Sequence, residues 1–94
     1  MAFREAKRRV LQALAEGTYL HEARNSIDVK NRFATGDVTA EFVAKVIGRC
    51  NGRDHSMSPH HRALHVTVHL IRREGWYIKF YFVAPDTWFI SVHQ

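Results

Sequence analysis

Apolar residues in the first half of the chain recur at the spacing of amphipathic helices. Between residues 3 and 16 they return every three or four positions, at Phe3, Ala6, Val10, Leu11 and Leu14. This pattern predicts a helix, and Gly17 is typical of its end. The segment DVTAEFVAKVIGRC predicts a second helix, capped by Asp37 or Thr39. Its expected buried stripe consists of Phe42, Val43, Val46, Ile47 and Cys50.

The stretch between these helices, residues 18–37, has a weaker pattern. Residues 19–23 are compatible with a short strand. Asn25 or Ser26 is a suitable cap for a short helix that runs through Arg32. We therefore expect two to three helices in the N-terminal half.

The second half of the chain alternates apolar and polar residues, as strands do. Three segments show the alternation: ALHVTVHLI, WYIKFYFV and TWFISVH. The sequences RREG and APDT between them are typical of turns. We therefore expect one α+β domain over residues 1–94. Its two to three N-terminal helices pack on a C-terminal antiparallel sheet of three to four strands.

Because successive strand residues point to opposite sides, the alternation divides the sheet into two faces. The face expected to meet the helices consists of Leu64, Val66, Val68, Leu70, Trp76, Ile78, Phe80, Phe82, Trp88, Ile90 and Val92. The other, more polar face consists of His65, Thr67, His69, Ile71, Tyr77, Lys79, Tyr81, Val83, Phe89, Ser91 and His93. Three-residue turns at residues 73–75 and 85–87 would set both His69 and His93 opposite Lys79.

Four of the seven histidines lie in the segment SPHHRALHVTVH. On a helix, His61, His65 and His69 would line one face at a spacing suited to zinc. The β-branched, alternating HVTVH instead favours a strand, on which His61 and His65 stand ~13 Å apart. We therefore expect neither a metal site nor a cofactor. HVT also resembles the His-x-Thr element of the two-histidine phosphoesterases, but that family needs two such elements.

Composition narrows the choice of partners and location. The formal net charge of +5 favours an anionic partner such as nucleic acid, an anionic membrane or an acidic protein. No apolar run approaches the ~20 residues of a membrane span, and the charged N-terminal sequence does not read as a signal peptide. The one cysteine excludes a disulfide framework, which fits a cytoplasmic protein.

Several features along the chain carry a family resemblance. They are a basic first helix that ends at Gly17, the segment Arg24–Ser26, a second helix closing with VIG, and the strand words WYIKF and FISVH. In these features the chain resembles the MqsR-type messenger-RNA interferase toxins, members of the RelE-like ribonuclease fold. The resemblance implies a metal-independent endoribonuclease that cleaves through attack by the 2′-OH. It also implies a cognate antitoxin as a partner, in a type II toxin–antitoxin system.

The resemblance also implies site residues. Tyr77 matches the family's strand tyrosine, Lys79 matches the lysine two positions later, and His93 stands where a catalytic terminal lysine is expected. His55 falls near another family lysine, and His65 is the polar residue nearest to the position of a family glutamine. Since histidine replaces lysine at two of these positions, the roles of base and acid are open to reassignment.

The residues themselves point to the same chemistry. Cleavage of RNA without a metal needs a base for the 2′-OH proton, cations around the phosphate, and an acid for the leaving oxygen. We expect the catalytic set His93, Tyr77, Lys79 and His55, with His60 and His61 as further candidates. The residues expected to bind RNA are His60, His61, Arg62, His65, His69 and Tyr81. The alternative is a non-catalytic RNA- or DNA-binding module with a basic, aromatic sheet face.

Overall fold

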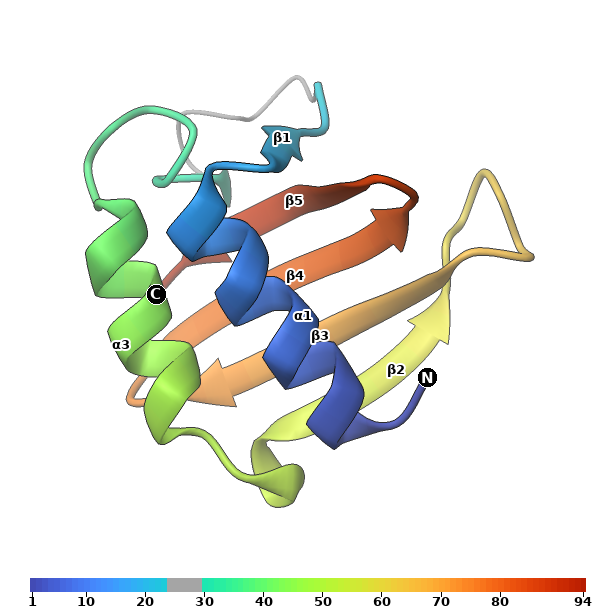
Figure 1. The fold of residues 1–94 in the computed structure, drawn as a ribbon, viewed down its shortest axis with the longest axis horizontal. Coiled ribbons are helices and arrows are strands. Elements are labelled where there is room, and N and C mark those ends of the chain that lie inside the picture. Colours follow the sequence, from blue (N-terminus) through green and yellow to red (C-terminus); the bar gives the residue numbers. More distant parts are fainter. Residues whose placement is uncertain (24–29) are drawn as a thin grey trace.

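The protein folds as a helical layer packed on a mixed five-stranded sheet, in a computed structural model that describes residues 1–23 and 30–94 (Figure 1). The strand order is β1-β5-β4-β3-β2, with β1 parallel to β5 and the other neighbours antiparallel. The strands are β1 (Tyr19–His21), β2 (His55–Pro59), β3 (Thr67–Arg73), β4 (Trp76–Val83) and β5 (Asp86–His93). The expected α+β class is confirmed.

The sheet has more strands than expected, and one of its strand pairs is parallel. The prediction of an antiparallel sheet of three to four strands is wrong, because β1 adds a parallel edge and β2 adds an antiparallel one. Residues 19–23 had been compatible with a strand, whereas HSMSP in β2 is mostly polar and gives no alternating signal. Short edge strands are held by their neighbours rather than by their own pattern.

The two helices of the described residues follow the prediction closely. Helix α1 (Phe3–Glu16) ends at Gly17, whose φ of 75° is the left-handed conformation that glycine adopts without strain. Helix α3 (Ala40–Arg49) begins at Thr39, whose hydroxyl accepts a hydrogen bond from the Phe42 N–H. The 3₁₀ turn η1 (Gly52–Asp54) then leads into β2. The short helix expected from Asn25 or Ser26 begins outside the described residues.

The hydrophobic core lies between these helices and one face of the sheet. Figure 1 shows α1 and α3 side by side on that face. The core consists of Val10, Leu14, Phe33, Val43, Val46, Ile47, Cys50, Ile71, Trp76, Ile78, Phe80, Phe89 and Val92. Burial raises the pKa of the Cys50 thiol, in keeping with the expectation that this cysteine packs in the core. We call the sheet face opposite α1 and α3 the open face.

The first hairpin turns in two residues instead of three. Arg73 pairs with Trp76, and both Glu74 and Gly75 have positive φ, as the tight turns of two-residue hairpins require. This change of one residue turns every β3 side chain to the other face. His69 therefore pairs with Phe80 rather than Lys79, and the predicted polar row of β3 is wrong.

The second hairpin contains a β-bulge that alters the faces of β5. Its strands also close in two residues, since Val83 pairs with Asp86. An irregularity between Lys79 and Phe80 leaves one extra residue on β5, so that the alternation reverses along that strand. As a result Phe89 joins the core and Trp88 lies on the open face, opposite to the prediction for both. Lys79 pairs with Ser91 instead of His93.

Candidate functional site

Three side chains from neighbouring strands stack across one end of the open face. Arg72 on β3 pairs with Tyr77 on β4, and Tyr77 pairs with His93 on β5. The Tyr77 and His93 rings are nearly parallel, with centroids 5.4 Å apart and planes 4° apart. The Arg72 guanidinium lies over the Tyr77 ring, its Cζ 4.9 Å from the centroid. We call Arg72, Tyr77 and His93 the open-face row.

A hydrogen bond to the backbone engages one nitrogen of the His93 imidazole. Nδ1 lies 3.0 Å from the carbonyl oxygen of Gln94. A carbonyl oxygen only accepts, so Nδ1 must carry the proton in this contact. In the neutral ring this leaves the lone pair on Nε2, which can accept a hydrogen bond. His93 is partly exposed, so a ligand on the open face can reach it.

Lys79 adds a second cation to the same face. It lies two residues from Tyr77 on β4, so the two side chains project from the same side about 7 Å apart along the strand. Among the described residues, neither Lys79 nor Arg72 forms an ion pair with a carboxylate. Both charges are therefore available to an anion. Tyr77, Lys79 and His93 thus share a face, as the sequence predicted.

His55 and His69 form a pair on the other side of the sheet. His55 Nε2 lies 2.9 Å from His69 Nδ1, and the His55 ring contacts Phe3 of α1. His69 is 1% exposed and stacks against Phe80 of the core. The expectation that His69 faces RNA is therefore wrong, because the two-residue turn places it under the helices. His55 likewise does not join the open-face row.

Burial keeps this histidine pair neutral. Desolvation, with smaller contributions from coulombic repulsion by His55 and by the N-terminal amino group, lowers the pKa of His69 from 6.5 to about 4. Desolvation also lowers the pKa of His55. The shared hydrogen bond occupies one nitrogen of each ring. This pair is therefore suited to packing rather than to exchanging protons near neutral pH.

A second cluster of rings involves the start of the β2–β3 loop. His60 is 6% exposed, with Nε2 3.1 Å from a carboxylate oxygen of Glu22 and Nδ1 accepting the Arg62 N–H. Both of its nitrogens are therefore engaged, which disagrees with the expected role of His60 in binding RNA. The exposed His61 stacks on His60, and the His60 ring meets the edge of Tyr81.

Trp88 completes this cluster on the open face. Its ring lies parallel to that of Tyr81, with centroids 6.3 Å apart and planes 3° apart. Sequence reasoning assigned Trp88 to the core, and the bulge in β5 is what turns it outwards. It also missed Arg72, which it counted with the turn RREG. The remaining expected RNA contacts, Arg62 and His65, are exposed in the loop between β2 and β3, away from the open-face row.

The described residues contain no cluster of three or more His, Cys, Asp or Glu side chains arranged to hold a metal ion. Nor do they include a helix with the length and apolar character needed to cross a membrane. Comparison with protein-family models, with curated proteins and with solved structures found no match for the chain.

Proposed function

We propose that the protein is a metal-independent endoribonuclease with a RelE-like fold, acting on messenger RNA. The observation that carries the proposal is the open-face row, in which a histidine, a tyrosine and an arginine stack beside Lys79, a lysine with no ion-pair partner among residues 1–23 and 30–94. These are the residue types that RNA cleavage without a metal requires: a base, an acid and cations. Their common face leaves them accessible to a polynucleotide.

Each residue has a role in the proposed reaction. His93 Nε2 removes the proton from a ribose 2′-OH, and the resulting oxygen attacks the adjacent phosphorus. The bond from phosphorus to the 5′-oxygen breaks, and the Tyr77 hydroxyl supplies the proton to that oxygen. Arg72 and Lys79 stabilise the charge that builds on the phosphoryl oxygens. The products are a 2′,3′-cyclic phosphate and a 5′-hydroxyl.

The biological setting belongs to the same proposal. The resemblance to the MqsR-type toxins supports a toxin of a type II toxin–antitoxin system, working in the cytoplasm. The net charge of +5 supports both RNA as substrate and an acidic antitoxin as partner. No cofactor or metal has a role in the proposed chemistry.

The test is incubation of purified protein with RNA in excess EDTA, followed by analysis of the new ends. We expect cleavage to persist and to leave a 2′,3′-cyclic phosphate or 3′-phosphate together with a 5′-hydroxyl. A His93→Ala preparation purified in parallel controls for contaminating ribonucleases. Activity restored only by added metal, or products with a 3′-hydroxyl and a 5′-phosphate, would contradict the proposal.

A second candidate function is a binding module that does not cleave. The parallel Tyr81 and Trp88 rings favour it, because aromatic side chains on a sheet are platforms for unpaired bases. The same EDTA experiment separates the two functions if affinity is measured alongside cleavage. A module would bind intact RNA with wild-type and His93→Ala proteins equally, and would lose affinity in Trp88→Ala.

A further inference from the structure

A pocket opens beside the open-face row, at the junction of η1, β2 and β3. Its volume is about 380 Å³, and its lining is formed by Arg53, Asp54, His55, Ser56 and Arg72. Arg72 belongs both to this pocket and to the open-face row. The pocket therefore adjoins the β3 end of the row, and Tyr77 on β4 and His93 on β5 lie one and two strand spacings of ~4.8 Å beyond Arg72.

The charges around the pocket suit an anion. Among the described residues, neither Arg53 nor Arg72 forms an ion pair, whereas the carboxylate of Asp54 is already occupied. One oxygen of Asp54 accepts the Asn51 N–H at 2.9 Å and lies 3.4 Å from an Arg73 nitrogen. The lining thus presents the hydroxyl of Ser56 and two guanidinium groups that no described carboxylate neutralises, a combination that binds phosphate.

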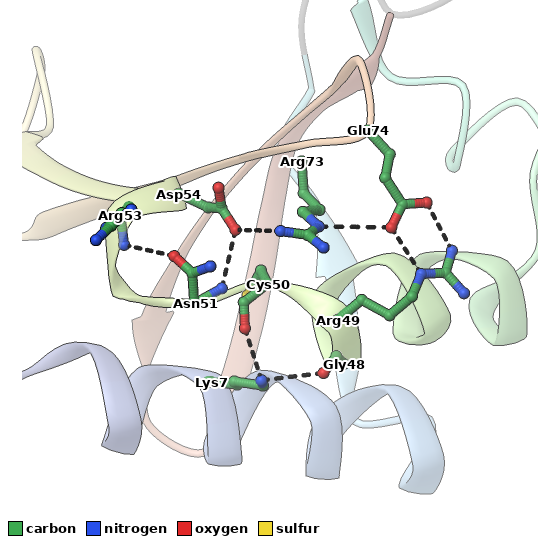
Figure 2. A network of polar contacts seen from close by, with 9 residues as sticks. All are labelled: Lys7, Gly48, Arg49, Cys50, Asn51, Arg53, Asp54, Arg73 and Glu74. Carbon is green, nitrogen blue, oxygen red and sulfur yellow. Dashed lines mark hydrogen bonds and ion pairs between the residues drawn. The ribbon is translucent and has the colours of Figure 1, made fainter.

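Asp54, which lines the pocket, also belongs to a network of polar contacts (Figure 2). Arg49 of α3 binds both carboxylate oxygens of Glu74, at 2.6 and 2.8 Å, and Glu74 also lies near Arg73. Through Asp54, this network ties the β3–β4 hairpin to η1. In Figure 2 the side chain of Arg53 projects from η1, and the dashed line to Asn51 comes from its backbone nitrogen.

Lys7 reinforces the same corner from α1. Its Nζ donates to the carbonyl oxygens of Gly48 and Cys50 at the end of α3, at 3.0 and 2.9 Å. Strand alternation separates the roles of two adjacent arginines: Arg73 turns towards this network and Arg72 turns to the open face. These contacts hold the backbone of η1 and the end of β3 against the helices, and Arg53 and Arg72 project from these two segments.

From this arrangement we infer that the pocket binds a backbone phosphate of the RNA, next to the phosphate that is cleaved. The inference rests on the proposed function, since it places the scissile phosphate at the open-face row. Arg72 is the bridge, because one side chain contributes to both positions. RNA is a better fit than an acidic protein, because the pocket continues into a row that can also stack on a base or ribose through Tyr77.

The test is the salt dependence of binding to a 2′-fluoro RNA oligonucleotide, which lacks the nucleophilic hydroxyl and stays intact. Each phosphate contact contributes about 0.7 to the slope of log affinity against log salt concentration for single strands. We expect Arg53→Ala to lower the slope by about this amount and to weaken binding several-fold at low salt. The control is Arg8→Ala, which removes the same charge from the exposed side of α1 and should leave the slope unchanged.

Two further measurements make the result decisive. Arg53→Lys should recover most of the slope, because it restores the charge, and the melting temperature should match that of wild type in all three variants. Equal slopes for Arg53→Ala and Arg8→Ala would overturn the inference. So would an Arg53→Ala protein that binds the RNA normally but loses affinity for polyglutamate, because the pocket would then serve an acidic protein.

The outcome for the phosphate pocket is independent of the outcome for cleavage. If wild-type protein does not cleave RNA but Arg53→Ala lowers the slope, the pocket stands and the nuclease proposal fails. If wild-type protein cleaves RNA in EDTA and Arg53→Ala behaves as Arg8→Ala does, the nuclease stands and the pocket fails. Binding and cleavage therefore need to be measured on the same preparations.

Discussion

Two groups of histidines lie on opposite faces of the same sheet, and their surroundings give them different chemistry. His69 is 1% exposed, packed against Phe80 and hydrogen-bonded to His55 beneath α1. His93 is partly exposed, stacked on Tyr77, and its Nε2 is left free by the bond from Nδ1 to a carbonyl. The buried ring has a pKa near 4 and little access to solvent. Position in the sheet thus decides which histidine a ligand can reach.

A single residue in one turn decides whether His69 lies on the helix side of the sheet or on the open face. His69 lies on the helix side because the β3–β4 turn has two residues rather than three. With one more residue, His69 would face solvent beside Lys79 and a leucine would face the core. The same turn brings Arg72 beside Tyr77, so it also builds the open-face row.

The largest effect is expected from removing the exposed histidine. His93→Ala should lower the single-turnover cleavage rate by about 10²–10⁴, as loss of a general base does. The free energy of unfolding should change by about 0.5 kcal/mol or less, because the side chain is outside the core. Rate measurements and thermal melts on one preparation check both values. The control His61→Ala removes an exposed histidine elsewhere, and a similar loss of rate there would count against the role of His93.

Removing the buried histidine should have the opposite profile. His69→Ala leaves a cavity among Phe80, Phe82 and His55, and we expect the free energy of unfolding to fall by about 2–4 kcal/mol. Cleavage per folded molecule should stay within a few-fold of wild type. Urea denaturation gives the free energy of unfolding. Cleavage rates are compared without urea, at a temperature at which the variant is folded. A stable His69→Ala protein with no activity would mean that the buried pair takes part in the reaction.

Acid should destabilise the protein through the same buried ring. The pKa of His69 is about 4 in the folded chain and 6.5 in the unfolded chain. Between these values the unfolded state binds a proton that the folded state does not, so stability falls as the pH is lowered from 6.5 to 4. The loss amounts to at most about 3 kcal/mol.

The pH effect is measured by urea denaturation at several pH values in wild type and His69→Leu. The leucine variant removes the titrating group while keeping an apolar side chain of similar size. We expect the free energy of unfolding of His69→Leu to fall less steeply than that of wild type as the pH is lowered from 6.5 to 4. The titration of carboxylates contributes equally to both proteins and does not affect the difference. Parallel curves for the two proteins would show that His69 is already protonated in the fold or exposed to solvent.

The smallest effect concerns the charge beside the row. Lys79→Ala should weaken RNA binding about two- to fivefold, in line with the 0.5–1 kcal/mol of an exposed charge contact. Cleavage should slow as well, because the same ammonium acts on the phosphate in the transition state. Lys45→Ala, an exposed lysine on α3, is the matched control for loss of charge. If Lys79→Ala and Lys45→Ala bind RNA with the same affinity, Lys79 does not contact the RNA.

The parts of the fold that the sequence predicted well are those with long, regular patterns. Helix α1, helix α3 and the whole of β4 follow directly from periodicity, and Thr39 was one of the two caps expected for α3. The shared face of Tyr77 and Lys79 follows from β4 alone. These elements are long enough for their side-chain spacing to identify both the type and the buried side.

The parts that it predicted poorly depend on single residues in turns and strands. In β3 Leu70 and Ile71 are adjacent, so each possible face carries an apolar residue at the centre of the strand, and the turn decides which one is buried. Glu74 adopts a positive φ that is unusual for a residue other than glycine, so a two-residue turn was not expected. Arg72 and Trp88 were missed for these reasons: one was assigned to the turn, and the other was reversed by the bulge.

The central claim is that RNA meets the open-face row and not the buried pair. The most direct measurement is an NMR titration with the 2′-fluoro RNA oligonucleotide, following the imidazole signals of His93 and His69 and the ring signals of Tyr77. We predict that the His93 and Tyr77 signals shift and saturate together while those of His69 stay in place. Shifts confined to His69, with His93 and Tyr77 unaffected, would contradict the account.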